Sequence, residues 1–267
     1  MREVLGEINW IAVSSRPDIS AAISLLQQRV NRAQVQYLIE VNIANKLVGV
    51  VRGFSHVTMR VLPIPPEKLG WTVWSDASWA NAEDLKSQGG YFVAATERAI
   101  DHGKWSAVSP TRWKNFKQDR QVASTLAAEL LTLSRALAEV SWIRSLWCEA
   151  EFGNYQLQND AVFSAKVPVV VAIDSKPVFD HVGSEVVSVK DKRVATEMLL
   201  VKNDVRTKGL SLKWIPTYQV LADCLTNENA PRQLLLRVLA ESRYRMTEDP
   251  EIKDWPGLRR LQEESMR

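Results

Sequence analysis

The chain has few of the residues that build disulfide frameworks and zinc sites. Its 267 residues include two cysteines and three histidines, and Cys148 and Cys224 form no Cys-x-x-Cys pair. Disulfide-stabilised and zinc-binding proteins place such residues in closely spaced sets. We therefore expect reduced thiols inside a cell and no zinc site.

Long apolar runs and a strong charge imbalance are also absent. No window approaches 18 uninterrupted apolar residues, and the first ten residues carry charges where a secretion signal needs an apolar core. This pattern predicts an intracellular, cytoplasmic protein that is neither secreted nor embedded in a membrane. The formal net charge is only +3, so the overall balance alone indicates no nucleic-acid partner.

Hydrophobic residues make up 46% of the chain, which is enough for a sizeable core. Apolar positions at helical spacing predict one helix over 16–30 and another over about 33–44. Residues 61–70, VLPIPPEKLG, hold three prolines and a glycine and are typical of a linker. We expect three parts: a helical segment over 1–66, a main domain over 67–230 and a charged tail over 231–267.

The stretch Trp71–Ala80, WTVWSDASWA, predicts a β-strand that ends by presenting a carboxylate. Short polar connections lead to two further strands, near 91–95 and 99–108, which predicts an antiparallel three-stranded meander. Ligand and metal sites form beyond the carboxyl ends of parallel strands in α/β sheets. Asp76, where the first strand stops, is therefore a candidate site residue.

The longest predicted helix follows, over about 122–150. An apolar stripe at helical spacing should face the sheet, and it consists of Leu126, Leu130, Leu133, Leu137 and Val140. Glu129 lies roughly 40 to 60 degrees from the centre of this stripe, at about 100 degrees per residue. Its carboxylate should point toward the sheet near the helix start. The alternative is an ordinary flanking glutamate that the helix dipole favours.

Two further carboxylates follow strands in the second half. The apolar run VPVVVAI, residues 167–173, is typical of a strand covered on both faces and ends at Asp174. A strand over 210–215 precedes a short helix over 220–226 that carries Asp223. A lone aspartate after a strand is often a helix cap. Four acids in one order are harder to explain in that way: Asp76, Glu129, Asp174 and Asp223.

Residues 109–121, SPTRWKNFKQDRQ, interleave positive charges with two aromatic residues. The basic residues are Arg112, Lys114, Lys117 and Arg120. Such a segment can follow phosphates and stack on bases, which makes these residues candidates for nucleic-acid binding. The alternative is a solvated loop whose aromatic residues cap the core.

The assembled order resembles the ribonuclease H fold and its Asp-Glu-Asp-Asp set. That fold is an α/β fold with a mixed five-stranded sheet, an antiparallel meander plus parallel strands, flanked by helices; here it would follow an N-terminal helical appendage. More narrowly, five phrases resemble the ribonuclease H domain of copia-type retrotransposon Pol polyproteins: WSDASWAN, SQGGYFVA, VASTLAAELLTLSRALAEVSWIRSLW, VAIDSKPV and LKWIPTYQVLADCLT. The phrase WIAVSSRPDISAAISLL resembles the segment that joins reverse transcriptase to ribonuclease H in those polyproteins. The resemblance runs in order from about Ile8 to Arg237.

The resemblance implies a metal-dependent endonuclease that hydrolyses the RNA strand of RNA/DNA hybrids within a retrotransposon reverse-transcription machinery. Asp76 would bridge two Mg²⁺ or Mn²⁺ ions, and Asp223 would hold the ion that activates water. Glu129 and Asp174 would hold the ion beside the leaving oxygen. Carboxylates without a cysteine or histidine ligand set suit these hard ions. The implied partners are the hybrid and the reverse transcriptase portion of the same polyprotein, in the cytoplasm or a virus-like particle.

The chain departs from the family pattern in two places. The stretch between the third strand and the Glu129 helix is longer and more basic than expected. The phrase VKDKR, Val189 to Arg193, stands where the family usually has a histidine, although His181 is nearby in the sequence. The Asp-Asp signature of a polymerase occurs nowhere, so the chain is not a reverse transcriptase by itself. Two alternatives stay open: a catalytically degenerate domain that binds nucleic acid or acts as a scaffold, and another nuclease or transposase of the same fold.

Overall fold

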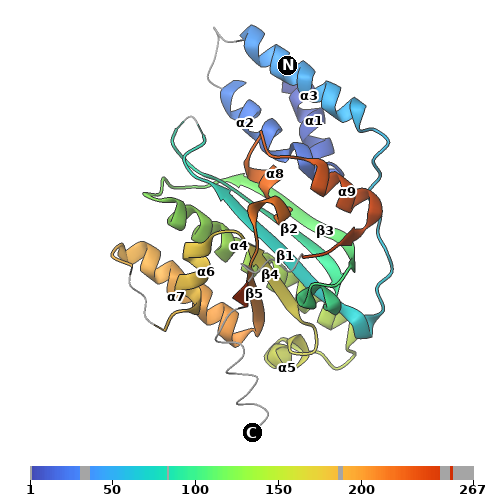
Figure 1. Ribbon diagram of the computed structural model, residues 1–267, viewed down its shortest axis with the longest axis vertical. Coiled ribbons are helices and arrows are strands. Elements are labelled where there is room, and N and C mark those ends of the chain that lie inside the picture. Colours follow the sequence, from blue (N-terminus) through green and yellow to red (C-terminus); the bar gives the residue numbers. More distant parts are fainter. Residues whose placement is uncertain (1, 31–36, 83, 186–188, 247–252, 255–267) are drawn as a thin grey trace.

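The computed structural model describes residues 2–30, 37–82, 84–185, 189–246 and 253–254, which form a mixed sheet with helices on both faces (Figure 1). The strands are β1 (Leu69–Ser78), β2 (Gln88–Glu97), β3 (Ser106–Lys117), β4 (Val169–Ile173), β5 (Leu210–Trp214), β6 (Arg243–Tyr244) and β7 (Lys253–Asp254). The α-helices are α1 (Arg2–Ser14), α2 (Ser20–Val30), α3 (Tyr37–Gly53), α4 (Thr125–Glu151), α5 (Asp160–Ser164), α6 (Lys176–Gly183), α7 (Lys192–Thr207), α8 (Asp223–Thr226) and α9 (Gln233–Glu241). Short 3-10 helices include η1 (Pro17–Ile19), η3 (Arg98–His102) and η5 (Thr217–Gln219).

The strand order is β6-β3-β2-β1-β4-β5-β7. Strands β1, β2 and β3 form an antiparallel meander, while β4 runs parallel to both β1 and β5. The two-residue strands β6 and β7 extend the predicted five strands, one at each edge. The predicted ribonuclease H-like α/β fold is therefore confirmed.

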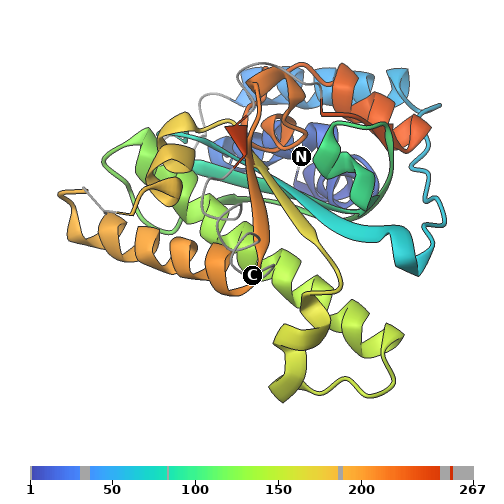
Figure 2. The same cartoon turned by 60° about the horizontal axis from the view of Figure 1, so that its bottom comes forward.

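Each face of the sheet has its own layer of helices, which explains why the central strands are apolar on both sides (Figure 2). Helix α4 crosses one face over β1 and β2, with α7 packed beside it. On the opposite face lie α8, α9 and the N-terminal helices. The alternation along β1 matches this division, because Val73 belongs to the α4 core and Trp74 to the α8 and α9 core.

The third strand lies later in the chain than predicted. Residues 99–108 were expected to form it, whereas η3 occupies Arg98–His102 and β3 runs from Ser106 to Lys117. The basic segment is therefore mostly strand, and its interpretation as a loop is wrong. Beyond residue 107, β3 pairs only with β2 among the described strands, and an edge strand tolerates charged side chains. The connection before α4 is short as a result.

Helix α4 carries the predicted apolar stripe into the main core. Ser124 caps its first turn, where the Ser124 hydroxyl accepts a hydrogen bond from the Ala127 amide at 3.3 Å. Leu130, Leu133 and Leu137 are almost fully buried against the sheet. This packing fixes the rotation of the helix and hence the direction of Glu129.

The N-terminal helices have a separate small core, to which Leu5, Ile19 and Leu26 contribute. The helix predicted over 16–30 begins as η1 and continues as α2. Residues 33–36 of the second predicted helix lie outside the described residues, and α3 extends beyond that helix to Gly53. Within 231–267, α9 packs into the second core of the sheet. The three domain boundaries stay predictions.

Among the described residues, no helix is both long enough and apolar enough to cross a membrane.

Candidate metal centre

Three of the four predicted acids meet near the carboxyl ends of the central strands β1 and β4. Asp76 comes from β1, Glu129 from the second turn of α4, and Asp174 from the position directly after β4. Each offers a carboxylate oxygen, and these oxygens lie within 4.8 Å of one another. Asp76 and Glu129 are only 7% and 8% exposed. The strand ends and the helix thus build a compact acidic cluster from distant parts of the chain.

The fourth acid, Asp223, opens the four-residue helix α8 and lies outside this group of three. It is still close enough that its charge helps to raise the pKa of Asp76. Asp223 therefore belongs to the neighbourhood of the cluster without sharing its tight geometry.

Two threonines and a tryptophan orient the clustered aspartates. The Thr226 hydroxyl donates to Oδ2 of Asp76, and the Thr217 hydroxyl donates to Oδ2 of Asp174 at 2.7 Å. The Trp214 indole N–H donates to the main-chain carbonyl of Asp174 at 2.9 Å. Sequence reasoning missed these partners. Thr226 carried a usable signal, because it follows Asp223 by three residues and shares its helix face.

The turn after β1 connects the elements that carry the other acids. The Trp79 indole N–H donates to the Val122 carbonyl at 3.0 Å, just before α4. The Asn81 side-chain amide donates to the Thr226 carbonyl at 3.0 Å, at the end of α8. The phrase WSDASWAN therefore supplies an acid and also forms hydrogen bonds to the start of α4 and the end of α8.

Two glycines of β2 allow those helices to approach the sheet. A Cβ on Gly90, the partner of Asp76 across the β1–β2 ladder, would lie 2.7 Å from Leu225 Cβ in α8. A Cβ on Gly89 would lie 2.5 Å from the Thr132 hydroxyl in α4. The SQGG phrase is thus explained by close packing on both sides of the cluster.

Burial and mutual repulsion raise the pKa values of the acids. Burial raises the pKa of Asp76 to about 7, with a further contribution from Asp174, while the Thr226 hydrogen bond opposes the rise. Burial and the charges of Asp76 and Asp174 raise the pKa of Glu129 well above its usual value. Burial also raises the pKa of Asp174, and burial with the Asp174 charge raises that of Asp223 to about 6.

The donor chemistry of this cluster fits a hard divalent cation. Its ligands are all carboxylate oxygens, which Mg²⁺ and Mn²⁺ prefer. No lysine or arginine of the described chain forms an ion pair with Asp76, Glu129 or Asp174. Within the described residues, the negative charge is therefore not neutralised by an ion pair.

The four basic candidates do not share one environment. Arg112 pairs with Glu139 of α4 at 3.4 Å, and Lys117 pairs with Asp84 at 2.6 Å. Lys114 and Arg120 are exposed and form no ion pair within the described chain. The structure places these residues along β3 and the connection to α4, outside the acidic cluster.

His181, the VKDKR phrase and the two cysteines lie outside the group of three acids. His181 lies in the last turn of α6, outside the group of three acids. In VKDKR, Asp191 caps α7 by accepting a hydrogen bond from the Arg193 amide at 2.8 Å. Both cysteines are free and buried, and neither belongs to a metal-binding group among the described residues.

The chain is similar in sequence to known polyproteins of transposons. Two retrovirus-related Pol polyproteins of Arabidopsis thaliana, from transposons RE2 and RE1, are each 25% identical over 227 residues, 84% of this chain. Its homologues are retrotransposon Pol polyproteins. The predicted resemblance to copia-type elements is thereby confirmed. The chain spans 14% of the length of these curated relatives.

No protein-family profile matches the chain. Among solved structures, an RNase H1 isolated from compost superposes with a TM-score of 0.41 and 17% identity, covering 60% of this chain and 94% of that one. An RNase H1 of Halobacterium salinarum superposes with a TM-score of 0.40 and 12% identity, covering 59% and 95%. The fold assignment rests on the strand order and directions described above.

Proposed function

We propose that this retrotransposon-related chain is a metal-dependent ribonuclease H that cleaves the RNA strand of RNA/DNA hybrids. The observation that carries the proposal is the meeting of Asp76, Glu129 and Asp174 within 4.8 Å, without a neutralising cation among the described residues. Bound divalent ions would supply an activated water and stabilise the leaving oxygen. The chain's own role is to hold the carboxylates that would bind these ions.

The hydrogen bonds around the cluster support this role. Thr226 and Thr217 each occupy one oxygen of an aspartate, which limits the rotation of that carboxylate. Preoriented ligands lose less conformational freedom when a metal binds. Asp223 would complete the set from α8, and its distance from the group depends on how α8 packs.

A surface groove of about 370 Å³ outside the acidic cluster supports nucleic-acid binding. It lies between β3 and α4 and combines Lys114 and Arg135 with Trp142, whose side chain is 62% exposed. Glu139 also lines it, and Arg135 pairs with Asp119. Cations and an exposed aromatic ring are the groups that follow a phosphate backbone and stack on bases. We propose that Lys114 and Arg120 contact phosphates directly. Arg112 and Lys117 would first have to leave their acidic partners.

The first experiment is cleavage of a labelled RNA/DNA hybrid by the purified chain with Mg²⁺ and then Mn²⁺. Single-stranded RNA and duplex DNA are assayed alongside, with Asp174→Asn as the test variant. Asp180→Asn is the matched control, because Asp180 is an exposed aspartate of the adjacent helix α6 that pairs only with Lys176 among the described residues. We expect hybrid cleavage that falls at least about a hundredfold in Asp174→Asn, or about 2.7 kcal/mol of barrier, and is unchanged in the control.

The same assay separates the alternatives. Cleavage of duplex DNA in preference to hybrid would favour another nuclease or a transposase of this fold. A folded protein that binds the hybrid without cutting it in either metal would favour a catalytically degenerate binding or scaffolding module. Either result would refute the proposed activity.

The phosphate contacts are tested by the salt dependence of hybrid binding. Lys114→Ala and Arg120→Ala should each reduce the slope of log affinity against log salt by about 0.9, the value for one lost phosphate contact on a duplex. Lys117→Ala, which removes the partner of Asp84, should change the slope less. Equal slopes for all three variants would contradict this assignment.

We further propose that the reverse transcriptase portion of the same polyprotein is a partner of this chain, within the cytoplasm or a virus-like particle. Support comes from the homology to retrotransposon Pol polyproteins, of which this chain spans 14%.

A further inference from the structure

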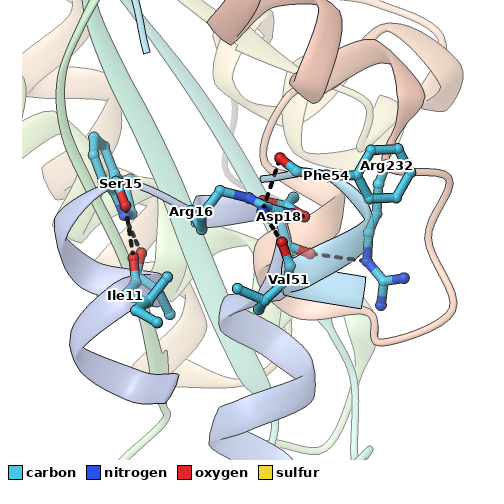
Figure 3. A network of polar contacts seen from close by, with 9 residues as sticks. Ile11, Ser15, Arg16, Asp18, Val51, Phe54 and Arg232 are labelled. Atoms are coloured by element: carbon cyan, nitrogen blue, oxygen red, sulfur yellow. Dashed lines mark hydrogen bonds and ion pairs between the residues drawn. The ribbon is translucent and has the colours of Figure 1, made fainter. Parts of the chain in front are cut away.

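The N-terminal segment is locked by a buried ion pair at η1 (Figure 3). Arg16 donates from Nε to Oδ1 of Asp18 at 2.7 Å and from Nη2 to Oδ2 at 2.8 Å. Both residues are buried, at 5% and 2% exposure. Nη1 of Arg16 also donates to the Val51 and Phe54 carbonyls at 3.3 and 3.4 Å. The ion pair therefore joins η1 to the end of α3.

The main-chain carbonyl of Asp18 accepts a hydrogen bond from Arg232, which follows α8. Nε of Arg232 donates to the Asp18 carbonyl at 3.1 Å, and Nη2 of Arg232 donates to the Glu228 carbonyl at 3.3 Å. The Glu228 carboxylate pairs with Arg29 of α2 at 3.1 Å. The loop after α8 is thus attached to the N-terminal segment at two points, which we call the α8 clamp: Asp18, Arg29, Glu228 and Arg232.

Helix α8 needs such external support because it has only four residues. A single turn fixes more backbone freedom than its few hydrogen bonds repay, so it forms only where packing holds it. On one side α8 packs against η1 and α2, and on the other it rests on Gly90 of β2. Its first residue is Asp223, and its last is Thr226, which donates to Asp76.

We propose that the α8 clamp positions α8 for metal binding, with Arg232 as its main positioning residue. The inference rests on the proposed function, because Asp223 and Thr226 matter here as parts of the metal centre. Asp223 lies outside the group of three acids, so the position of α8 sets its distance from them. The N-terminal segment, distant in sequence from every acid of the cluster, then helps to set the geometry of the site.

The test uses the full chain and the variant Arg232→Met, which keeps an aliphatic side chain but loses both hydrogen bonds. Arg237→Met is the matched control, since Arg237 is exposed on the adjacent helix α9. Two measurements need no substrate: amide hydrogen exchange of residues 223–227, and calorimetric titration with Mn²⁺ alone. The Leu225 and Asn227 amides report directly on α8, because each donates to a main-chain carbonyl at its start.

We expect Arg232→Met to speed exchange of these two amides at least tenfold and to weaken Mn²⁺ binding about tenfold. Exchange in β4 should stay as in the parent, and Arg237→Met should change neither measurement. Arg232→Lys, which keeps one donor, should recover part of both effects. Unchanged exchange and Mn²⁺ affinity in folded Arg232→Met would overturn the proposal, and so would an equal rise of exchange throughout the sheet.

A milder variant guards against loss of folding. Glu228→Gln removes the charge of the partly exposed pair with Arg29 but keeps an acceptor oxygen, so it should shift both measurements in the same direction by a smaller factor. No shift in this variant together with none in Arg232→Lys would refute the clamp. If the parent chain fails to cut hybrids while the exchange and Mn²⁺ results hold, the ribonuclease proposal fails and the positioning of α8 stands.

Discussion

The raised pKa of Asp76 predicts that the metal-free protein loses stability as the pH rises toward neutrality. A carboxyl whose pKa is higher in the folded state binds its proton more tightly there than in the unfolded chain. The resulting stabilisation is complete below the unfolded pKa and disappears as the pH rises through the folded one. For Asp76 these values are 3.8 and about 7. The unfolding free energy should therefore fall between about pH 4 and pH 7.

The size of the effect follows from the same two values. At about 1.4 kcal/mol for each tenfold change in proton affinity, the difference from 3.8 to about 7 corresponds to on the order of 4 kcal/mol. Asp76→Asn cannot ionise and keeps an oxygen that accepts from Thr226. In chelator, the variant should match the parent near pH 4 and be more stable by several kcal/mol at pH 8. Saturating Mg²⁺ should reverse this order, because only the parent keeps all three carboxylates.

Urea denaturation followed by tryptophan fluorescence at pH 4 to 8 measures the effect. Glu149→Gln is the control, since it removes an exposed acid from the helix that carries Glu129. Its stability difference from the parent should not grow with pH. The reasoning is refuted if the difference between Asp76→Asn and the parent is the same at pH 5 and pH 8.

Three further outcomes are expected. Gly90→Ala should lower the unfolding free energy by about 1–3 kcal/mol in urea titrations, since its Cβ would meet Leu225 and Thr226, whereas Gly49→Ala, with nothing within 4 Å, should not destabilise the protein. Leu137→Ala should cost about 2–5 kcal/mol in the same titrations, and Leu146→Ala on the exposed face of α4 far less. Thr217→Val removes a hydrogen bond that lowers the pKa of Asp174, so the acidic limb of the cleavage pH profile should move to higher pH; an unmoved limb would contradict that role.

The sequence predicted those parts of the site that local periodicity controls. The strand pattern of WTVWSDASWA predicted that β1 presents Asp76 near its end, and the leucine stripe of α4 placed Glu129 at its margin; both agree with the structure. Asp174 was predictable because an apolar run ends at it. For Glu129 a repeat of about 3.6 residues fixes the direction of the side chain, whereas Asp76 and Asp174 were placed by where their strands end.

Other features depend on contacts that leave no local pattern. Strand β3 was placed too early, because Arg112 and Lys114 make its outer part resemble a loop, and pairing with β2 overrides that polarity. The distance of Asp223 from the other acids depends on the packing of α8 rather than on spacing. The bond from Arg232 to Asp18 joins residues 214 positions apart, which no periodicity reveals.

That long-range bond also bears on how the chain acquires its fold. Alternate residues of β3 contact the N-terminal helices as well. The Trp113 indole N–H donates to the Ala12 carbonyl, and the Asn115 side-chain amide donates to the Ser20 main-chain carbonyl. Contacts between such distant residues carry a large loop-closure entropy and slow the search for the native state. During synthesis, the N-terminal helices can form their own small core early, whereas their bonds to β3 and then to Arg232 must wait until those residues are made. A nascent chain paused before residue 220 should therefore contain this helical core without its attachment to α8.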